Sequence, residues 1–134
     1  MVLYGLHQSA YKFYMLFYSL LISLGMVWCN ADHGIFFGEW ASLPDPSIMM
    51  PVDGSPLVLY VPIHVDDGLA ITNSQSLYLW FLKTLAHCLM IVDLGYCSKF
   101  LSILIICDRP NRCLWLSSHI YIAELLDKWH LTNC

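Results

Sequence analysis

At 134 residues the chain has the length of one small domain, so a single hydrophobic core is the first expectation. Hydrophobic residues make up 58% of the sequence and charged residues 12%, which indicates either missing partner domains or contact with a membrane. Only six residues are Lys or Arg and the net charge is -4, so the composition excludes a broad basic surface for binding nucleic acid.

The six cysteines form no Cys-x-x-Cys pair, and no signal peptide precedes them. This favours reduced thiols and an intracellular location, in the cytoplasm or the nucleus. Two Cys/His pairs, Cys29 with His33 and His130 with Cys134, have a spacing that some zinc sites use. Because the usual paired thiols are missing, we interpret these pairs as packing or surface residues and predict no metal there.

The first long apolar run covers residues 13–29 and contains no charged residue. Its length is at the lower limit for a helix that crosses a bilayer about 30 Å thick. We favour a buried core helix, because Gly25 lies late in the run and Ser19 and Ser23 are one helical turn apart. The alternative is a small, non-enzymatic hydrophobic or membrane-associated protein built on this helix.

The middle of the sequence predicts two strands and a loop. Residues 33–40 have the character of a short strand, and the Pro-, Ser-, Asp- and Gly-rich residues 41–56 predict a surface loop rather than a domain linker. Residues 57–65 (LVLYVPIHV) form a nearly continuous apolar run, which is typical of a strand covered on both faces. Pro62 predicts a bulge or a locally unpaired edge within this strand, because proline has no N–H to donate.

The strand at residues 57–65 is followed by Asp66, Asp67 and Gly68, and the apolar pattern then resumes at residues 69–72. An Asp-Gly pair between two apolar runs is a strong hairpin signal. We therefore predict a tight antiparallel hairpin with both aspartates at its tip and at least one carboxylate exposed.

The remaining elements are predicted from capping and periodicity. Ser74 is a candidate N-cap for a helix over residues 77–89. Residues 100–107 and 113–116 predict a second hairpin, and residues 120–131 have the apolar spacing of a last helix. This order predicts the α+β class, an antiparallel sheet with helices packed on one face.

Adjacent carboxylates at a hairpin tip repel each other and attract a cation. Magnesium is the natural occupant, because it takes one or two carboxylates and completes its shell with water and phosphates, and Mn²⁺ is the alternative ion. In two-metal phosphoryl transfer the protein presents carboxylates from two different strands. Asp66 and Asp67 account for only one of these two strands. The competing interpretation of the pair alone is a solvated turn.

Five blocks of the chain resemble, in the same order, conserved blocks of copia-type reverse transcriptases. They are residues 2–10 (VLYGLHQSA), the Asp32-His33 step, residues 59–74 (LYVPIHVDDGLAITNS), residues 92–95 with 100–103, and residues 114–117 with 121–122. Short apolar strings recur by chance, but five in register cover almost the whole chain.

The resemblance implies that residues 1–134 are a partial, ferredoxin-like palm domain of an RNA-directed DNA polymerase, truncated at both ends. It implies that Asp66 and Asp67 bind Mg²⁺ and that Gln8 lies near the incoming nucleotide. Residues 114–118 match the hairpin that supports the primer end. The implied partners are an RNA or DNA template-primer and a deoxynucleoside triphosphate, bound by the intact polyprotein.

Several positions depart from the family pattern. The family's other catalytic aspartate precedes the first matched block and is absent here, so we expect the chain alone to be inactive and to bind little nucleic acid. Ser102 replaces a frequent glycine, and His64 replaces a frequent tyrosine. His64 either contacts a primer phosphate beside the two carboxylates or packs among its hairpin neighbours.

Four aromatic residues, Tyr60, Tyr78, Trp80 and Trp115, have no Lys or Arg interleaved with them. We interpret them as core residues rather than as platforms for stacking bases. In the full enzyme the fingers and thumb should cover this sheet and its helices. Without them we expect a large exposed apolar surface.

Overall fold

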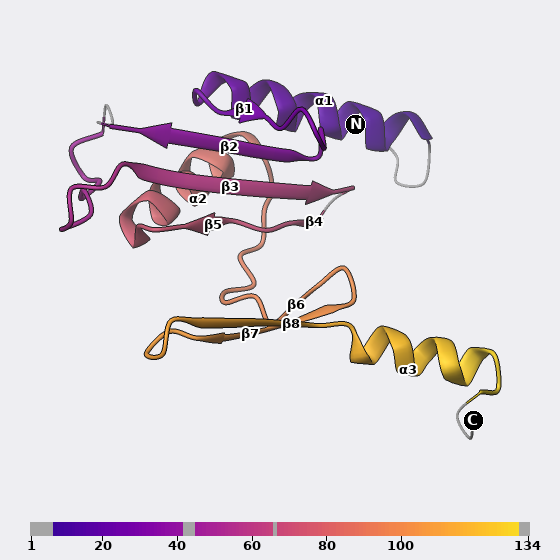
Figure 1. Ribbon diagram of the computed structural model, residues 1–134. Coiled ribbons are helices and arrows are strands. Elements are labelled where there is room, and N and C mark those ends of the chain that lie inside the picture. The colour runs from indigo at the N-terminus through magenta and orange to yellow at the C-terminus, as the bar shows by residue number, and fades with distance from the viewer. Residues whose placement is uncertain (1–6, 42–44, 66, 132–134) are drawn as a thin grey trace. The chain divides into compact units, whose positions relative to one another are not determined.

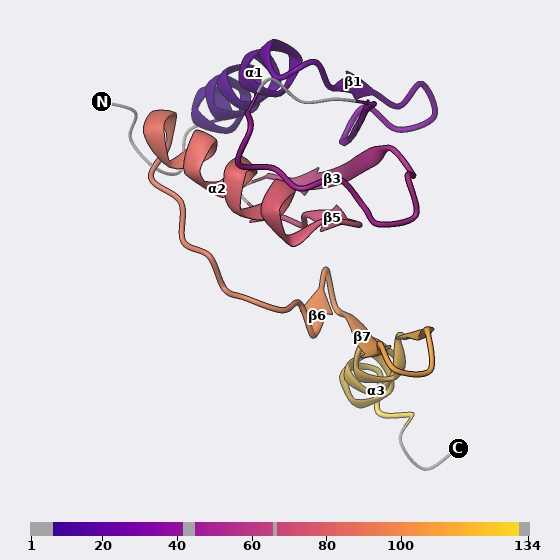
Figure 2. The same ribbon diagram turned by 90° about the vertical axis from the view of Figure 1, so that its left-hand side faces the viewer.

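The computed structural model describes residues 7–41, 45–65 and 67–131, and it forms two compact units, Met1–Val92 and Asp93–Cys134 (Figure 1). Each unit contains its own antiparallel sheet. In the first unit two helices cover one face of the sheet (Figure 2). The predicted α+β class, an antiparallel sheet with helices on one face, is therefore confirmed.

Helix α1 (His7–Ser23) supplies Phe17 and Leu21 to the core. The helix ends earlier than the predicted helix over residues 13–29, and the short strand β1 (Val27–Trp28) follows it. The prediction was therefore wrong for the second part of this run. No helix in the described part of the chain is long and apolar enough to cross a membrane.

A Schellman motif explains where α1 ends. Gly25 has a φ of +80°, a left-handed conformation that glycine adopts without a Cβ penalty. Its N–H donates to the carbonyl of Ile22 at 2.9 Å, and the N–H of Met26 donates to the carbonyl of Leu21 at 3.1 Å. Leu21 and Met26 are both buried, which adds the apolar contact that usually accompanies this motif.

The first sheet is antiparallel throughout, and its central strands are β2 and β3. Strand β2 confirms the predicted strand after His33, and β1 pairs with it as an edge that the sequence did not predict. The strands that complete this sheet are β2 (Ile35–Trp40), β3 (Leu57–His64), β4 (Asp67–Gly68) and β5 (Ile71–Thr72).

Strand β3 alternates between buried and exposed side chains, so the prediction that both of its faces are covered was wrong. Leu57, Leu59 and Val61 are buried against the helices. Tyr60, on the opposite face, is 47% exposed. This is the usual pattern of an antiparallel strand that packs on helices with one face only.

Helix α2 (Gln75–Cys88) is capped as predicted, because the side chain of Ser74 accepts a hydrogen bond from the N–H of Leu77 at 3.3 Å. The loop before β3 is attached to the same end of the helix. The N–H of Met49 donates to the hydroxyl of Ser76 at 3.0 Å, and Ile48 is buried in the core. The described part of the loop therefore packs on the first unit, as expected for a surface loop rather than a linker.

The second unit contains β6 (Lys99–Phe100), β7 (Ile103–Asp108), β8 (Cys113–Ser117) and α3 (His119–Lys128). Strands β7 and β8 confirm the predicted second hairpin, and α3 confirms the last helix. The predicted strand over 100–107 is interrupted, because Leu101 and Ser102 form a turn between β6 and β7. None of the described residues in this unit is buried, so the core of the molecule lies in the first unit.

Candidate metal-binding hairpin

Strands β3 and β4 form the predicted hairpin, with His64 opposite Asp67 and Ile63 opposite Gly68. Asp67 and Gly68 therefore belong to the second arm, and the turn lies two residues earlier than the Asp-Gly turn that the sequence suggested. The same register continues between β3 and β5, so the shifted turn follows from the pairing of the whole hairpin.

Val65 is the turn residue that the structure describes, and it has a φ of +58°. This conformation is strained for a β-branched residue, and such strain is often found at functional sites. The side chain of Val65 is also 59% exposed. Asp66, the first of the two predicted metal-binding residues, lies outside the described residues.

Asp67 and His64 lie on the side of the sheet that the helices do not cover. Both are exposed, and because they are directly opposite in an antiparallel pair, their side chains project from the same face. The exposed carboxylate confirms the prediction for Asp67. The structure records no hydrogen bond or ion pair from either side chain to another described residue.

Pro62 weakens the hairpin between its tip and its base. The carbonyl of Pro62 accepts a hydrogen bond from the N–H of Leu69 at 3.0 Å, but proline cannot return the reciprocal bond. The second arm is interrupted at this point, between β4 and β5. Pro62 lies opposite Ile35 in the central strand, so of the predicted bulge or unpaired edge only a local gap toward the second arm is present. Two residue pairs, 63 with 68 and 64 with 67, hold the tip beyond this gap.

An apolar row crosses the exposed face of the sheet. Val27, Phe37, Tyr60 and Ile71 are aligned by the strand registers, and each is at least 37% exposed. The rings of Phe37 and Tyr60 are stacked, with centroids 6.3 Å apart. The prediction that Tyr60 is a core residue was therefore wrong, although its position in the period-2 pattern of β3 could have placed it on this face.

The other predicted residues are not brought to the hairpin tip within the described residues. Gln8 lies in the first turn of α1, but its side chain is outside the described part of the structure. Residues 114–118, which match the primer-supporting hairpin, belong to the second unit. The described residues contain no group of three or more His, Cys, Asp or Glu side chains placed to share a metal ion.

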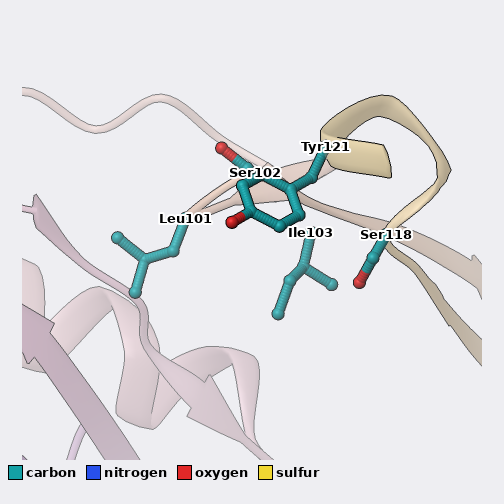
Figure 3. Close-up of a pocket in the computed structure, with 5 residues that line it drawn as sticks. All are labelled: Leu101, Ser102, Ile103, Ser118 and Tyr121. Atoms are coloured by element: carbon teal, nitrogen blue, oxygen red, sulfur yellow. The ribbon is translucent and has the colours of Figure 1, made fainter. Parts of the chain in front are cut away.

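The second unit has a shallow hollow of about 280 Å³ between the β6–β7 turn and the start of α3. Figure 3 shows the ring of Tyr121 beside this turn. The hollow is lined by Leu101, Ser102, Ile103, Ser118 and Tyr121, and none of the predicted metal-binding residues takes part.

The chain is similar to a retrovirus-related Pol polyprotein from transposon TNT 1-94 of Nicotiana tabacum, with 26% identity over 131 residues. The alignment covers 98% of this chain but 9% of that relative, so the chain spans about a tenth of its length. No protein-family model matches the chain, and no solved structure matches it. The similarity supports an origin from a retrotransposon.

Proposed function

We propose that the chain is part of the RNA-directed DNA polymerase of a retrotransposon Pol polyprotein, and that its first unit is a portion of the palm domain. The observation that carries this proposal is the β3–β4 hairpin, whose strained turn joins an exposed histidine to an exposed aspartate on the uncovered face of the sheet. The similarity to a Pol polyprotein over 98% of the chain supports the same assignment.

In this proposal Asp66 and Asp67 hold Mg²⁺, with Mn²⁺ as a substitute. Carboxylate oxygens are the ligands that both ions prefer, and the described carboxylate, that of Asp67, is exposed and without a described partner. When bound, the ion would neutralise phosphate charge during nucleotidyl transfer to a primer 3′ hydroxyl.

His64 projects from the same face as Asp67, so it is placed to donate a hydrogen bond to a phosphate of the template-primer. Gln8 is assigned to the incoming nucleotide by the family resemblance alone. The substrates would be a template-primer and a deoxynucleoside triphosphate, and nucleotidyl transfer would take place inside the cell, in the cytoplasm or the nucleus. With six Lys and Arg residues in all, the chain should bind little nucleic acid by itself.

Paramagnetic line broadening by Mn²⁺ in NMR spectra of the chain would test the metal site. Broadening should be strongest for the amides of residues 63–68, and Asp66→Asn and Asp67→Asn should each reduce it. Asp127→Asn, which removes an exposed carboxylate from α3, is the matched control and should leave it unchanged. If all three variants broaden alike, or if broadening is spread over the acidic surface, the proposed site is wrong.

A further inference from the structure

Strand β8 forms a free edge of the second sheet, because the strand order is β6-β7-β8. Its sequence, Cys-Leu-Trp-Leu-Ser, contains no charged residue and no proline, the two devices that usually protect an edge. Leu114, Trp115 and Leu116 are each at least 50% exposed. The strand therefore offers both unpaired backbone groups and apolar side chains to a partner.

The register shows which backbone groups face outward. The N–H of Ile105 donates to the carbonyl of Ser98, on the β6 side of β7, so the neighbouring residues Leu104 and Ile106 point their backbone groups toward β8. Their partners on β8 are Ser117 and Trp115. By the alternation of an antiparallel ladder, Leu114 and Leu116 direct their N–H and C=O groups to the free edge.

From this pattern we propose that β8 pairs antiparallel with β8 of a second copy of this chain, about a two-fold axis through Trp115. Leu114 of one copy then lies opposite Leu116 of the other in a hydrogen-bonded pair, and symmetry repeats the pair. Trp115 lies opposite its own copy in a non-hydrogen-bonded pair, where side chains approach most closely. Cross-strand aromatic pairs in this position stabilise antiparallel sheets.

The charges and the other edges favour a second copy as the occupant. Pairing about Trp115 places Arg112 opposite Ser118, so no like charges meet across the axis. The opposite edge of this sheet, β6, has two residues, one of which is Lys99, and the outer strands of the first sheet also have two residues each. Strand β8 is thus the longest free edge among the described strands, and the edge most suited to pairing with itself.

The paired area is small, so the dimer should be weak and its formation should depend on concentration. Sedimentation equilibrium of the whole chain should show a monomer-dimer equilibrium. Leu116→Lys should shift its midpoint to about tenfold higher concentration or more, because the dimer contains two copies of the Leu114–Leu116 pair. Leu94→Lys, at an 89% exposed position outside the strands, is the matched control and should not shift it.

A cross-link tests the register independently of stability. The pairing places Cys113 opposite Ser117 of the other copy in a non-hydrogen-bonded pair, a geometry that suits a disulfide. Ser117→Cys should therefore form a covalent dimer on mild oxidation, and the double variant Ser117→Cys/Cys113→Ser should not. A chain that stays monomeric at all concentrations, equal effects of the two lysine substitutions, or equal cross-linking of both cysteine variants would overturn the proposal.

Discussion

Ser102 holds a backbone conformation that few residues other than glycine adopt. Its φ is +67° and that of Leu101 is +49°, so both central residues of the β6–β7 turn are left-handed, as in a type I′ hairpin. The copia-type pattern that this sequence resembles frequently has glycine here, and a left-handed φ is a physical reason for that preference. The sequence showed that serine replaces the family's frequent glycine at this position. Only the structure shows that the serine backbone is held in a strained conformation.

Replacing Ser102 with glycine should therefore stabilise the second unit. We expect the free energy of opening the β6–β7 hairpin to rise by about 0.5–1 kcal/mol, since a left-handed φ costs a non-glycine residue somewhat more than glycine loses in chain entropy. Amide hydrogen exchange of residues 103–105 measures this opening. Ser98→Gly, at a position without a positive φ, should have the opposite sign, and faster exchange in Ser102→Gly would contradict the prediction.

Asp108 organises the β7–β8 turn through its carboxylate. The side-chain amide of Asn111 donates to one carboxylate oxygen at 2.7 Å, and the backbone N–H of Asn111 donates to the other at 3.1 Å. These hydrogen bonds, the side-chain one first, lower the pKa of Asp108 below its usual value of 3.8. They favour the ionised form, because a carboxylate accepts both bonds.

The lowered pKa fixes the sign of the pH dependence of this turn. Its contribution to stability should be fully present above the ordinary pKa of an aspartate and should be lost as the pH falls through the lowered pKa of folded Asp108. In an NMR titration, Asn111→Ala should raise the pKa of Asp108 toward its ordinary value. An unchanged pKa of Asp108 in Asn111→Ala would contradict the assigned cause.

Among the elements, those with a local chemical signal were predicted well. The Ser74 N-cap, the two hairpins and the gap in the ladder at Pro62 each depend on neighbouring residues, and the structure contains them. The end of α1 was predicted too late because an apolar run does not reveal by itself where helix changes to strand. Gly25 was the available signal, and its meaning as a C-cap followed only from its φ angle.

Gly25→Ala should destabilise the first unit by about 1–2 kcal/mol, which is the cost of a left-handed conformation for a residue with a Cβ atom. The cost is conformational, because an added Cβ would meet no closer atom than Nε1 of Trp40 at 3.6 Å. Thermal and urea unfolding measure the change. Gly68→Ala is the matched control, since its φ is not left-handed and an added Cβ meets nothing within 4 Å; equal losses in both variants would contradict this account.

For the whole molecule, the class was predictable from the order of the elements, but the distribution of burial was not. We expected one core spread over the whole chain, but the described part of the second unit buries no residue. Trp115, which we predicted to be a core residue, is 50% exposed. Large apolar side chains are exposed in both units, as the composition led us to expect. Burial depends on contacts between distant segments, which periodicity within one segment cannot specify.

The candidate site was predictable to a similar degree. The order of residues around Asp66 and Asp67 predicted a hairpin with an exposed carboxylate. In the structure Asp67 belongs to such a hairpin and is exposed. The sequence left open whether His64 lies beside the carboxylates or packs among its hairpin neighbours, and it did not predict the apolar row, because both depend on strand register.

The purified chain should show no template-dependent primer extension with Mg²⁺ or Mn²⁺. Two-metal transfer needs carboxylates that hold both ions and place the primer hydroxyl against the nucleotide's α-phosphate. The described residues contain no group of three or more His, Cys, Asp or Glu side chains that could share a metal ion. A template-primer is also bound mainly through its phosphates, for which the sequence offers only six Lys and Arg residues.

The assay would follow extension of a labelled primer on RNA and DNA templates, with Asp66→Asn as the control. Extension that depends on the template and is lost in Asp66→Asn would show that the chain completes a catalytic site by itself, against this expectation.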